Sequence, residues 1–137
     1  MNRWLMKSEP SSYSWEQLVK DGRTNWNGVR NAQASNNLKA MKKGDRAFFY
    51  HSNEGLAVVG IVEIAKEAYP DPSDKEGRFV MVDVKPVMPV KTPVTLAAIK
   101  AEKKLADIAL VRQSRLSVQP VSAPEWQLIC KMAGVKP

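Results

Sequence analysis

The sequence predicts an α+β domain built on a curved β-sheet or a small barrel. About five segments rich in Val, Ile and aromatic residues are typical of strands, and helical segments are inserted between them. Strands and helices do not alternate regularly, which favours the α+β class over a parallel α/β sheet. The 137 residues have the length of one ordinary domain. We therefore expect a single domain over residues 1–137.

Composition restricts the classes of partner. The formal net charge of +7 and the pI near 9.6 suit a polyanionic partner such as nucleic acid. One cysteine, Cys130, and one histidine exclude an internal disulfide and a Cys/His metal cluster, so no metal or cofactor is expected. No apolar run approaches the length of a membrane span, and the N-terminus lacks the apolar region of a signal peptide. These features predict a cytoplasmic protein with no membrane partner.

The first elements are marked by proline and by capping signals. The run RWLMK at 3–7 predicts a strand that ends before Pro10. The segment SWEQLVKDG at 14–22 predicts a short helix, with Ser14 as the N-cap and Gln17 at the reciprocal position of a capping box.

One face of this helix is predicted to enter the core. It carries Trp15, Leu18 and Val19. A loop at about 23–30 follows, and then a helix at about 31–43 with a polar beginning and an apolar later face.

The middle of the chain is predicted to be β-rich. The segments 46–52 and 56–69 are expected to form a hairpin across a three-residue turn in which Gly55 takes a positive φ. The polar residues 70–77 are expected to form a surface loop.

The remaining elements complete the α+β pattern. Segment 78–90 predicts a third long strand that Pro86 and Pro89 bend or end. A short helix is expected at 96–104 and a last strand at 115–121. The signals of the final helix are Ser122 (N-cap), Pro124 (first turn), Glu125 (capping box) and Gly134 (stop).

The segment NWNGVRNAQASNN at 25–37 is the clearest candidate for a binding surface. Trp26 lies in a polar, glycine-containing loop, where an indole favours a pocket wall or an interface over core packing. Its face can stack on a planar ligand, Asn27 and Asn31 can recognise hydrogen-bonding edges, and Arg30 suits a phosphate or a base edge. The other tryptophans are predicted to lie in the core: Trp4, Trp15 and Trp126.

Other reactive side chains have simpler interpretations. His51 follows a strand and favours a hydrogen-bonding role over general-base catalysis, because no neighbouring residue completes a triad. Cys130 is expected to be buried in a helix. Lys7 and Glu9 form either a surface ion pair or the charged rim of a pocket, and spacing alone does not separate these alternatives.

Four segments taken together resemble the EVE domain family, which includes small bacterial relatives of thymocyte nuclear protein. The resemblance extends in order over nearly the whole chain. The segments are WLMKSEP (4–10), WNGVRNAQASNNLKAMKKGDRAFFYHS (26–52), VGIVEIAKEAYPD (59–71) and LVRQSRLSVQP (110–120).

This resemblance implies a PUA-like fold, a small curved β-barrel with helices packed around it. It also implies kinship with YTH domains and a function as a reader of modified bases, notably modified cytosine, in DNA or RNA. Bacterial members are associated with defence against modified foreign DNA, which implies a nuclease or defence-system partner; this chain would be the reader alone. The oligomeric state is not set by the sequence, and a monomer is favoured.

The resemblance also implies the residues of the base-binding pocket. Arg115 and Ser117 are implied as members of a phosphate or secondary pocket, and Tyr69 and Tyr50 are the candidates for a second aromatic wall. Ser35 stands where family members commonly have arginine. The implied pocket residues are Lys7, Ser8, Glu9, Trp26, Asn27, Gly28, Val29, Arg30, Asn31, His51 and Ser52.

The principal hypothesis is a non-catalytic reader that stacks a flipped or single-stranded base on Trp26. One alternative is an amidohydrolase acting on a modified nucleoside, with Lys7 and Glu9 as the reactive pair. A second alternative is an adaptor whose tryptophan loop binds protein.

Overall fold

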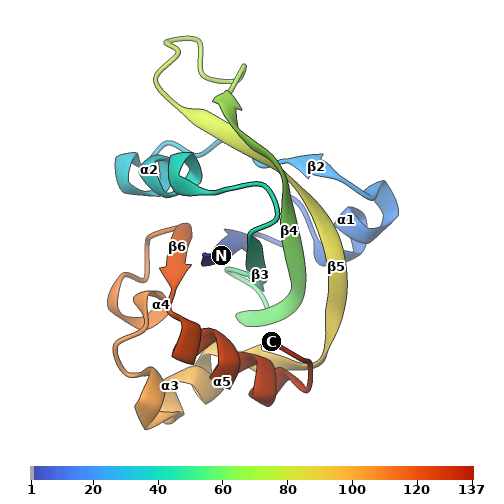
Figure 1. Ribbon diagram of the computed structural model, residues 1–137, viewed down its shortest axis with the longest axis vertical. Helices are drawn as coiled ribbons and strands as arrows, with labels where there is room; N and C mark the ends of the chain where they lie inside the picture. Colours follow the sequence, from blue (N-terminus) through green and yellow to red (C-terminus); the bar gives the residue numbers. More distant parts are fainter. Residues whose placement is uncertain (1) are drawn as a thin grey trace.

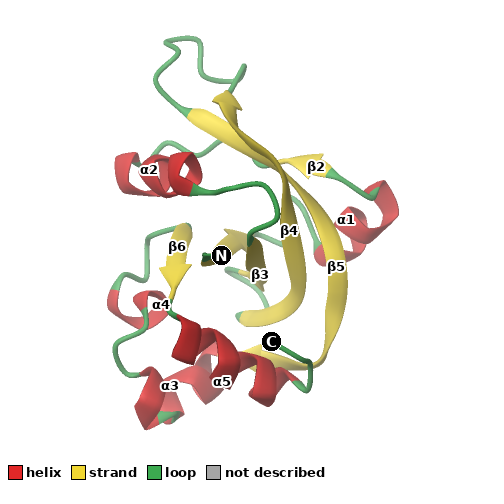
Figure 2. Cartoon of the chain, in the orientation of Figure 1, coloured by secondary structure: helices red, strands yellow, loops and turns green. Residues whose placement is uncertain are grey.

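A computed structural model describes residues 2–137 and contains one six-stranded mixed sheet (Figures 1 and 2). The strand order is β2-β5-β4-β3-β1-β6, and β1 pairs with β3 in parallel while the other neighbours are antiparallel. The strands are β1 (Arg3–Ser8), β2 (Thr24–Asn25), β3 (Arg46–His51), β4 (Ala57–Pro70), β5 (Val80–Thr95) and β6 (Val118–Val121). The helices are α1 (Trp15–Asp21), α2 (Ala32–Ala40), α3 (Leu96–Ala101), the short η1 (Lys103–Leu105), α4 (Ala109–Arg112) and α5 (Ala123–Ala133).

The sheet is strongly curved and open. Its long strands β4 and β5 bend around the centre of the molecule in Figure 1, while β2 and β6 form its two edges. The predicted α+β class with a curved sheet is confirmed. The word barrel describes this fold loosely, because no pairing between β2 and β6 closes the sheet within the described residues.

Two hydrophobic cores cover the two faces of the sheet. Alternation along β1 sends Trp4 and Met6 into the first core and Leu5 into the second, and the adjacent Phe49 and Phe48 of β3 divide in the same way. Helices α1 and α2 complete the first core, and α3, α4 and α5 complete the second. In Figure 2, α1 and α2 lie above α3, α4 and α5. The strand segments are therefore apolar on both faces.

Local capping chemistry places the ends of the first and last helices, α1 and α5, largely as predicted. The Ser14 side chain accepts a hydrogen bond from the Gln17 backbone N–H at the start of α1. The Gln17 side chain, however, donates to Asp21 one turn later, so the second half of the expected capping box is replaced by a bond within the helix. Val19 is 52% exposed and does not share the buried face of Trp15. The last helix, α5, has the predicted reciprocal capping box between Ser122 and Glu125 and ends at Gly134 in the left-handed conformation.

Several predicted boundaries differ from the structure. Strand β5 continues through Pro86 and Pro89 to Thr95, so the prolines do not end it, while its register against β4 shifts beside each of them, in line with the predicted bend. This is possible because β2 pairs only with Asp83 and Val84, so the later part of β5 is an edge on that side, where a missing N–H is tolerated. The helix predicted at 31–43 ends at Ala40, and the strand predicted at 115–121 begins at Val118. Neither β2 nor α4 was predicted.

Candidate binding cavity

A cavity of about 480 Å³ opens beside the end of β1. Two stretches of chain line it, one before and one after helix α1, so the cavity lies where the chain enters and leaves this helix (Figure 1). The volume falls in the range of small-ligand sites, about 300–1,000 Å³. The lining residues are Lys7, Ser8, Glu9, Ser12, Tyr13, Thr24, Asn25, Trp26, Asn27 and Gly28.

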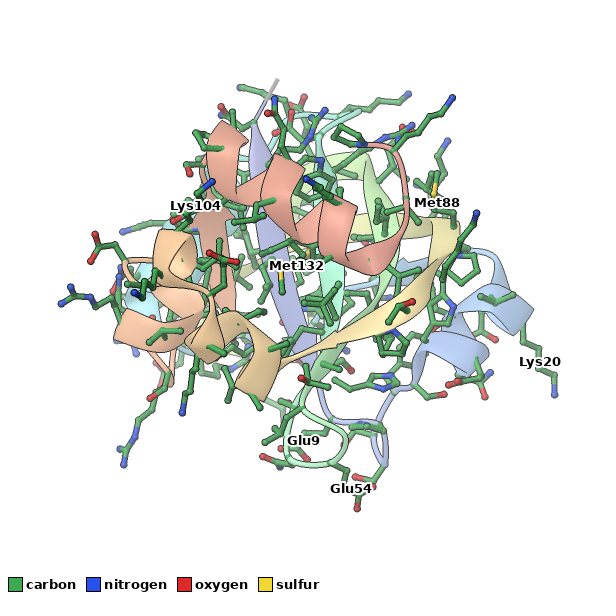
Figure 3. All side chains as sticks on the ribbon, turned by 90° about the horizontal axis from the view of Figure 1, so that it is seen from below. Glu9, Lys20, Glu54, Met88, Lys104 and Met132 are labelled. Atoms are coloured by element: carbon green, nitrogen blue, oxygen red, sulfur yellow. The ribbon has the colours of Figure 1, made fainter. Side chains whose placement is uncertain are left out.

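The first stretch is held in a tight turn after β1. The carbonyl of Glu9 accepts hydrogen bonds from the backbone N–H groups of Ser12 (2.9 Å) and Tyr13 (2.8 Å). The Ser8 hydroxyl donates to the Tyr13 carbonyl at 2.6 Å. The backbone N–H of Ser52 donates to the Ser8 carbonyl at 2.9 Å, and Figure 3 shows the loops of Glu9 and Glu54 at the same end of the molecule. The turn is therefore fixed both internally and by the loop after β3.

Lys7 places a cation at the cavity. Its Nζ donates a hydrogen bond of 2.7 Å to the Ser114 carbonyl, and its backbone N–H donates to the Ser117 carbonyl at 2.9 Å. Burial lowers the pKa of the Lys7 ammonium from its ordinary value. Glu9 is exposed at the rim. Thus Lys7 is a positioned donor, while the carboxylate of Glu9 stays hydrated.

Trp26 belongs both to the core and to the cavity wall. Its backbone N–H donates to the Val82 carbonyl at 2.7 Å, which extends the short pairing of β2 with β5. The indole packs edge to face on Phe49, with ring centroids 5.6 Å apart, and the residue is only 8% exposed. Most of the indole is therefore structural, and a limited part borders the cavity.

A buried carboxylate holds the second stretch in place. Asp71, which is 2% exposed, accepts hydrogen bonds from the Gly28 N–H (2.8 Å), Arg30 Nη1 (3.2 Å) and both the N–H and the hydroxyl of Ser73. Burial alone would raise the pKa of Asp71, but the Ser73, Gly28 and Arg30 hydrogen bonds outweigh it and lower the pKa to about 2. Gly28 has φ = 81°, a conformation that glycine adopts without strain. Asp71 was predicted only as part of a surface loop, so its role as an anchor was missed.

The structure brings together six of the predicted pocket residues. They are Lys7, Ser8, Glu9, Trp26, Asn27 and Gly28. Three others from the same sequence segment point elsewhere: Val29 is buried in the first core, Arg30 pairs with Asp71, and the Asn31 side chain caps α2 by accepting from the Ala34 N–H. These three support the segment and do not line the cavity.

His51 and Ser52 make hydrogen bonds to the segments next to the cavity. His51 Nε2 accepts a hydrogen bond of 3.1 Å from the backbone N–H of Trp15, and burial lowers the pKa of the imidazole. Ser52 contributes its backbone N–H to Ser8. Neither residue lines the cavity. His51 therefore has the hydrogen-bonding role expected of it.

The aromatic wall differs from the prediction. Tyr50 is 2% exposed in the second core, and the Tyr69 hydroxyl donates to Asp83, so neither candidate lines the cavity. Tyr13 does line it, and its hydroxyl donates to Asp21 at 2.8 Å. The available signal was its position in the turn that directly follows Lys7, Ser8 and Glu9. Other lining residues that were missed are Ser12, Thr24 and Asn25.

Arg115 and Ser117 lie apart from the main cavity. Arg115 borders a separate cavity with Asn31 and Gln33, while Ser117 contributes its carbonyl to the backbone of Lys7. Ser35 lies on α2 away from the main cavity; it is 2% exposed, and its hydroxyl has no hydrogen-bond partner among the described residues.

Across residues 2–137, no three His, Cys, Asp or Glu side chains gather as metal ligands. In the same part of the chain, no helix combines the length and apolarity needed to cross a membrane. The residues of the cavity wall carry aromatic rings, amides, hydroxyls, the Lys7 ammonium and the Glu9 carboxylate, which suit a planar polar ligand with hydrogen-bonding edges.

The fold and the cavity define a small α+β binding domain, and the chain belongs to the EVE domain family, whose model matches residues 2–132. Human thymocyte nuclear protein 1 is 36% identical to this chain in an alignment 170 residues long, which covers 99% of this chain and 76% of the human protein. Two solved structures share the fold. A Rhodopseudomonas palustris protein solved by NMR is 60% identical, with a TM-score of 0.93 over 98% of this chain and 94% of its own. Human THYN1 protein in complex with 5-methylcytosine-containing DNA is 36% identical, with a TM-score of 0.92 over 100% of both chains.

Proposed function

We propose that this protein is a non-catalytic reader of a modified base, with modified cytosine in DNA as its ligand. The base, flipped out of a duplex or presented by a single strand, would enter the cavity between 7–13 and 24–28. The observation that carries the proposal is this polar cavity in a fold shared over the whole chain with human THYN1 protein, which was solved with 5-methylcytosine-containing DNA.

The cavity offers two kinds of contact to a base. Trp26 and Tyr13 line it and would provide aromatic surface, and stacking of a base on an aromatic side chain contributes about 1–3 kcal/mol. The side chains of Asn25 and Asn27 and the Lys7 ammonium can bind the hydrogen-bonding edge. The Ser8 hydroxyl already donates its proton to a carbonyl, so it offers the ligand an acceptor.

Selection of a methyl group would come from filling an apolar part of the cavity. Such a contact contributes a modest 1–3 kcal/mol, corresponding to roughly a 5- to 150-fold preference. The net charge of +7 adds affinity for phosphates that is independent of sequence. Base contacts therefore set the preference, and the charge sets the general affinity and its dependence on salt.

Fluorescence anisotropy with four labelled oligonucleotides tests the proposal. Two probes are DNA duplexes of one sequence, the first with one 5-methylcytosine and the second unmodified. The other two are single strands of that sequence, one of DNA and one of RNA. We expect the methylated DNA to bind most tightly. Equal affinity for the methylated and plain probes would refute base reading, and tighter binding of RNA would assign the protein to RNA.

Variants of Trp26 must separate stacking from folding, because this residue is largely buried. Trp26→Phe keeps an aromatic ring in the core, and we expect it to reduce the preference for the methylated probe while the protein stays folded. The matched control is Lys104→Ala, which removes an exposed cation beside α5, distant in sequence from the cavity stretches. If Trp26→Phe prefers the methylated probe as strongly as the wild type does, the indole is not part of the proposed base-binding site.

One observation favours a second candidate, an amidohydrolase acting on a modified nucleoside. Lys7 and Glu9 border the same cavity, and burial lowers the pKa of the Lys7 ammonium from its ordinary value. Incubation with modified nucleosides followed by mass spectrometry separates the two functions. A reader yields no product, whereas an enzyme yields product that is lost in Glu9→Gln.

A protein-binding adaptor remains the third hypothesis, and it predicts no salt-dependent binding to any of the oligonucleotides. A cytoplasmic location and a nuclease partner are likewise predictions. Affinity purification from cells with and without nuclease treatment of the nucleic acid tests whether a partner binds directly.

A further inference from the structure

We propose a phosphate-binding subsite in a cleft between helix α2 and the loop that joins β4 to β5. This subsite rests on the proposed function: its ligand is a phosphodiester of the strand whose base occupies the main cavity. The cleft measures about 290 Å³ and shares no lining residue with the main cavity. The lining residues are Ala32, Ser35, Asn36, Lys39, Arg78 and Phe79.

The first argument is an unpartnered hydroxyl in this cleft. Ser35 is 2% exposed, and its Oγ makes no hydrogen bond among the described residues, although buried polar side-chain atoms nearly always have a partner. Its backbone N–H already donates to the Asn31 carbonyl as part of the helix. Ser35 lines the cleft, but its Oγ has almost no accessible surface, so a phosphate oxygen would satisfy this donor only after the side chain rotates toward the cleft.

The second argument is the charge around this hydroxyl. Lys39 follows Ser35 by one helical turn on the same face and takes part in no ion pair of the described residues. Arg78 reaches the cleft from the loop after β4. Its Nε lies 3.4 Å from Glu76, but the two side chains are 70% and 74% exposed, and such surface pairs exchange readily for a stronger partner. No carboxylate lines the cleft itself, and the nearby Asp74 is held by the backbone N–H groups of Arg78 and Phe79, from which it accepts hydrogen bonds.

The third argument is a path from the cleft to the main cavity. The guanidinium carbons of Arg78 and Arg30 each lie 5.6 Å from the centroid of the Phe79 ring, so one ring positions two cations. Arg30 lies two residues after Gly28, which lines the main cavity. Trp26 and Ala32 are six residues apart, a span of at most about 20 Å. At about 3.4 Å per nucleotide along one strand, the two sites are about six nucleotides apart or fewer.

Salt-dependent binding to the methylated and plain duplexes tests the subsite. We expect Lys39→Ala and Arg78→Ala each to lower the slope of log K against log salt by about 1 and to weaken binding roughly 3- to 10-fold. The preference for the methylated probe should stay unchanged, because these cations do not contact the base. Ser35→Ala should weaken binding only a few-fold, with the slope unchanged, because it removes a neutral donor.

Lys104→Ala and Lys131→Ala are the matched controls, since both are exposed lysines of another cleft. If the Lys39 and Arg78 variants change the slope no more than these controls do, the subsite is refuted. If the slope falls as expected while the wild type shows no preference for 5-methylcytosine, base reading fails and the phosphate subsite stands. The two proposals therefore fail separately.

A scan with neutral methylphosphonate linkages locates the phosphate. One linkage is replaced at a time within about six nucleotides of the modified base. We expect one position at which the neutral linkage weakens binding of the wild type. At that position the same linkage should not weaken binding of the Lys39→Ala/Arg78→Ala double variant any further. If the double variant is as sensitive as the wild type at every position, no phosphate binds in this cleft.

Discussion

The carboxylate of Asp71 accepts a hydrogen bond of 2.8 Å from the backbone N–H of Gly28 and so joins the loop after β4 to the wall of the main cavity. The same carboxylate accepts from Arg30 and from Ser73. Because Asp71 is almost fully buried, its negative charge is compensated only by these neighbours. One residue outside the cavity thus fixes the backbone that forms part of it.

Asp71→Asn should destabilise the protein. The amide keeps one acceptor oxygen but brings an NH₂ group against Gly28 and Arg30, which leaves buried donors without partners. We expect the free energy of unfolding to fall by roughly 1–3 kcal/mol, measured by urea denaturation. Asp107→Asn is the control, because its salt bridge with Arg112 is exposed and contributes little. Equal effects of the two substitutions would contradict the anchoring role.

The same carboxylate should make stability depend on pH in the acid range. Its pKa is lowered from the ordinary 3.8 to about 2 in the folded protein, so its contribution is fully present above about pH 4 and is lost as the pH falls toward 2. The shift corresponds to about 2 kcal/mol. Unfolding free energies measured between pH 5 and pH 2 should therefore fall less steeply in Asp71→Asn than in the wild type. Parallel pH profiles of the two proteins would show that other carboxylates account for the acid sensitivity.

Gly60→Ala should be strongly destabilising for a steric reason. A Cβ at Gly60 would lie 2.5 Å from ring carbons of Trp15, because the indole of α1 packs directly on the backbone of β4. Overpacking of this kind costs about 1–3 kcal/mol, and thermal or urea unfolding measures it. Trp15→Leu provides the test of mechanism. In the double variant the cost of the alanine should be smaller than in the wild-type background, and simple additivity would contradict a clash with the indole.

Tyr13 should contribute to base binding as the aromatic wall that the sequence did not identify. Tyr13→Ala is expected to weaken binding of the 5-methylcytosine probe by about 5- to 150-fold, since a stacking contact is worth about 1–3 kcal/mol. Tyr13→Phe should keep most of the affinity, because it removes only the hydroxyl bonded to Asp21. Tyr69→Ala serves as the control away from the cavity. A loss in the Tyr69 variant equal to that of Tyr13→Ala would contradict the assignment.

The ends of α5 could be predicted because capping is local chemistry. Ser122, Glu125 and Gly134 lie within one helix and its flanks, and their spacing alone specifies the caps of α5. Strand ends could not be predicted in this way. Pro86 and Pro89 were expected to bend or end β5, and they do not end it, because whether a proline interrupts a strand depends on which of its edges is paired, and the short β2 leaves that edge free.

The sequence by itself determined the α+β class, the caps of the last helix and the family, and it pointed to Lys7, Ser8, Glu9 and the Trp26 segment as the site. These features depend on composition, periodicity and short motifs. Only the tertiary structure decided that Tyr13 and not Tyr50 or Tyr69 borders the cavity, and that Asp71 holds its wall. The reason is physical: Gly28 and Asp71 lie 43 residues apart, and only the folding of the chain around the curved sheet brings such groups into contact.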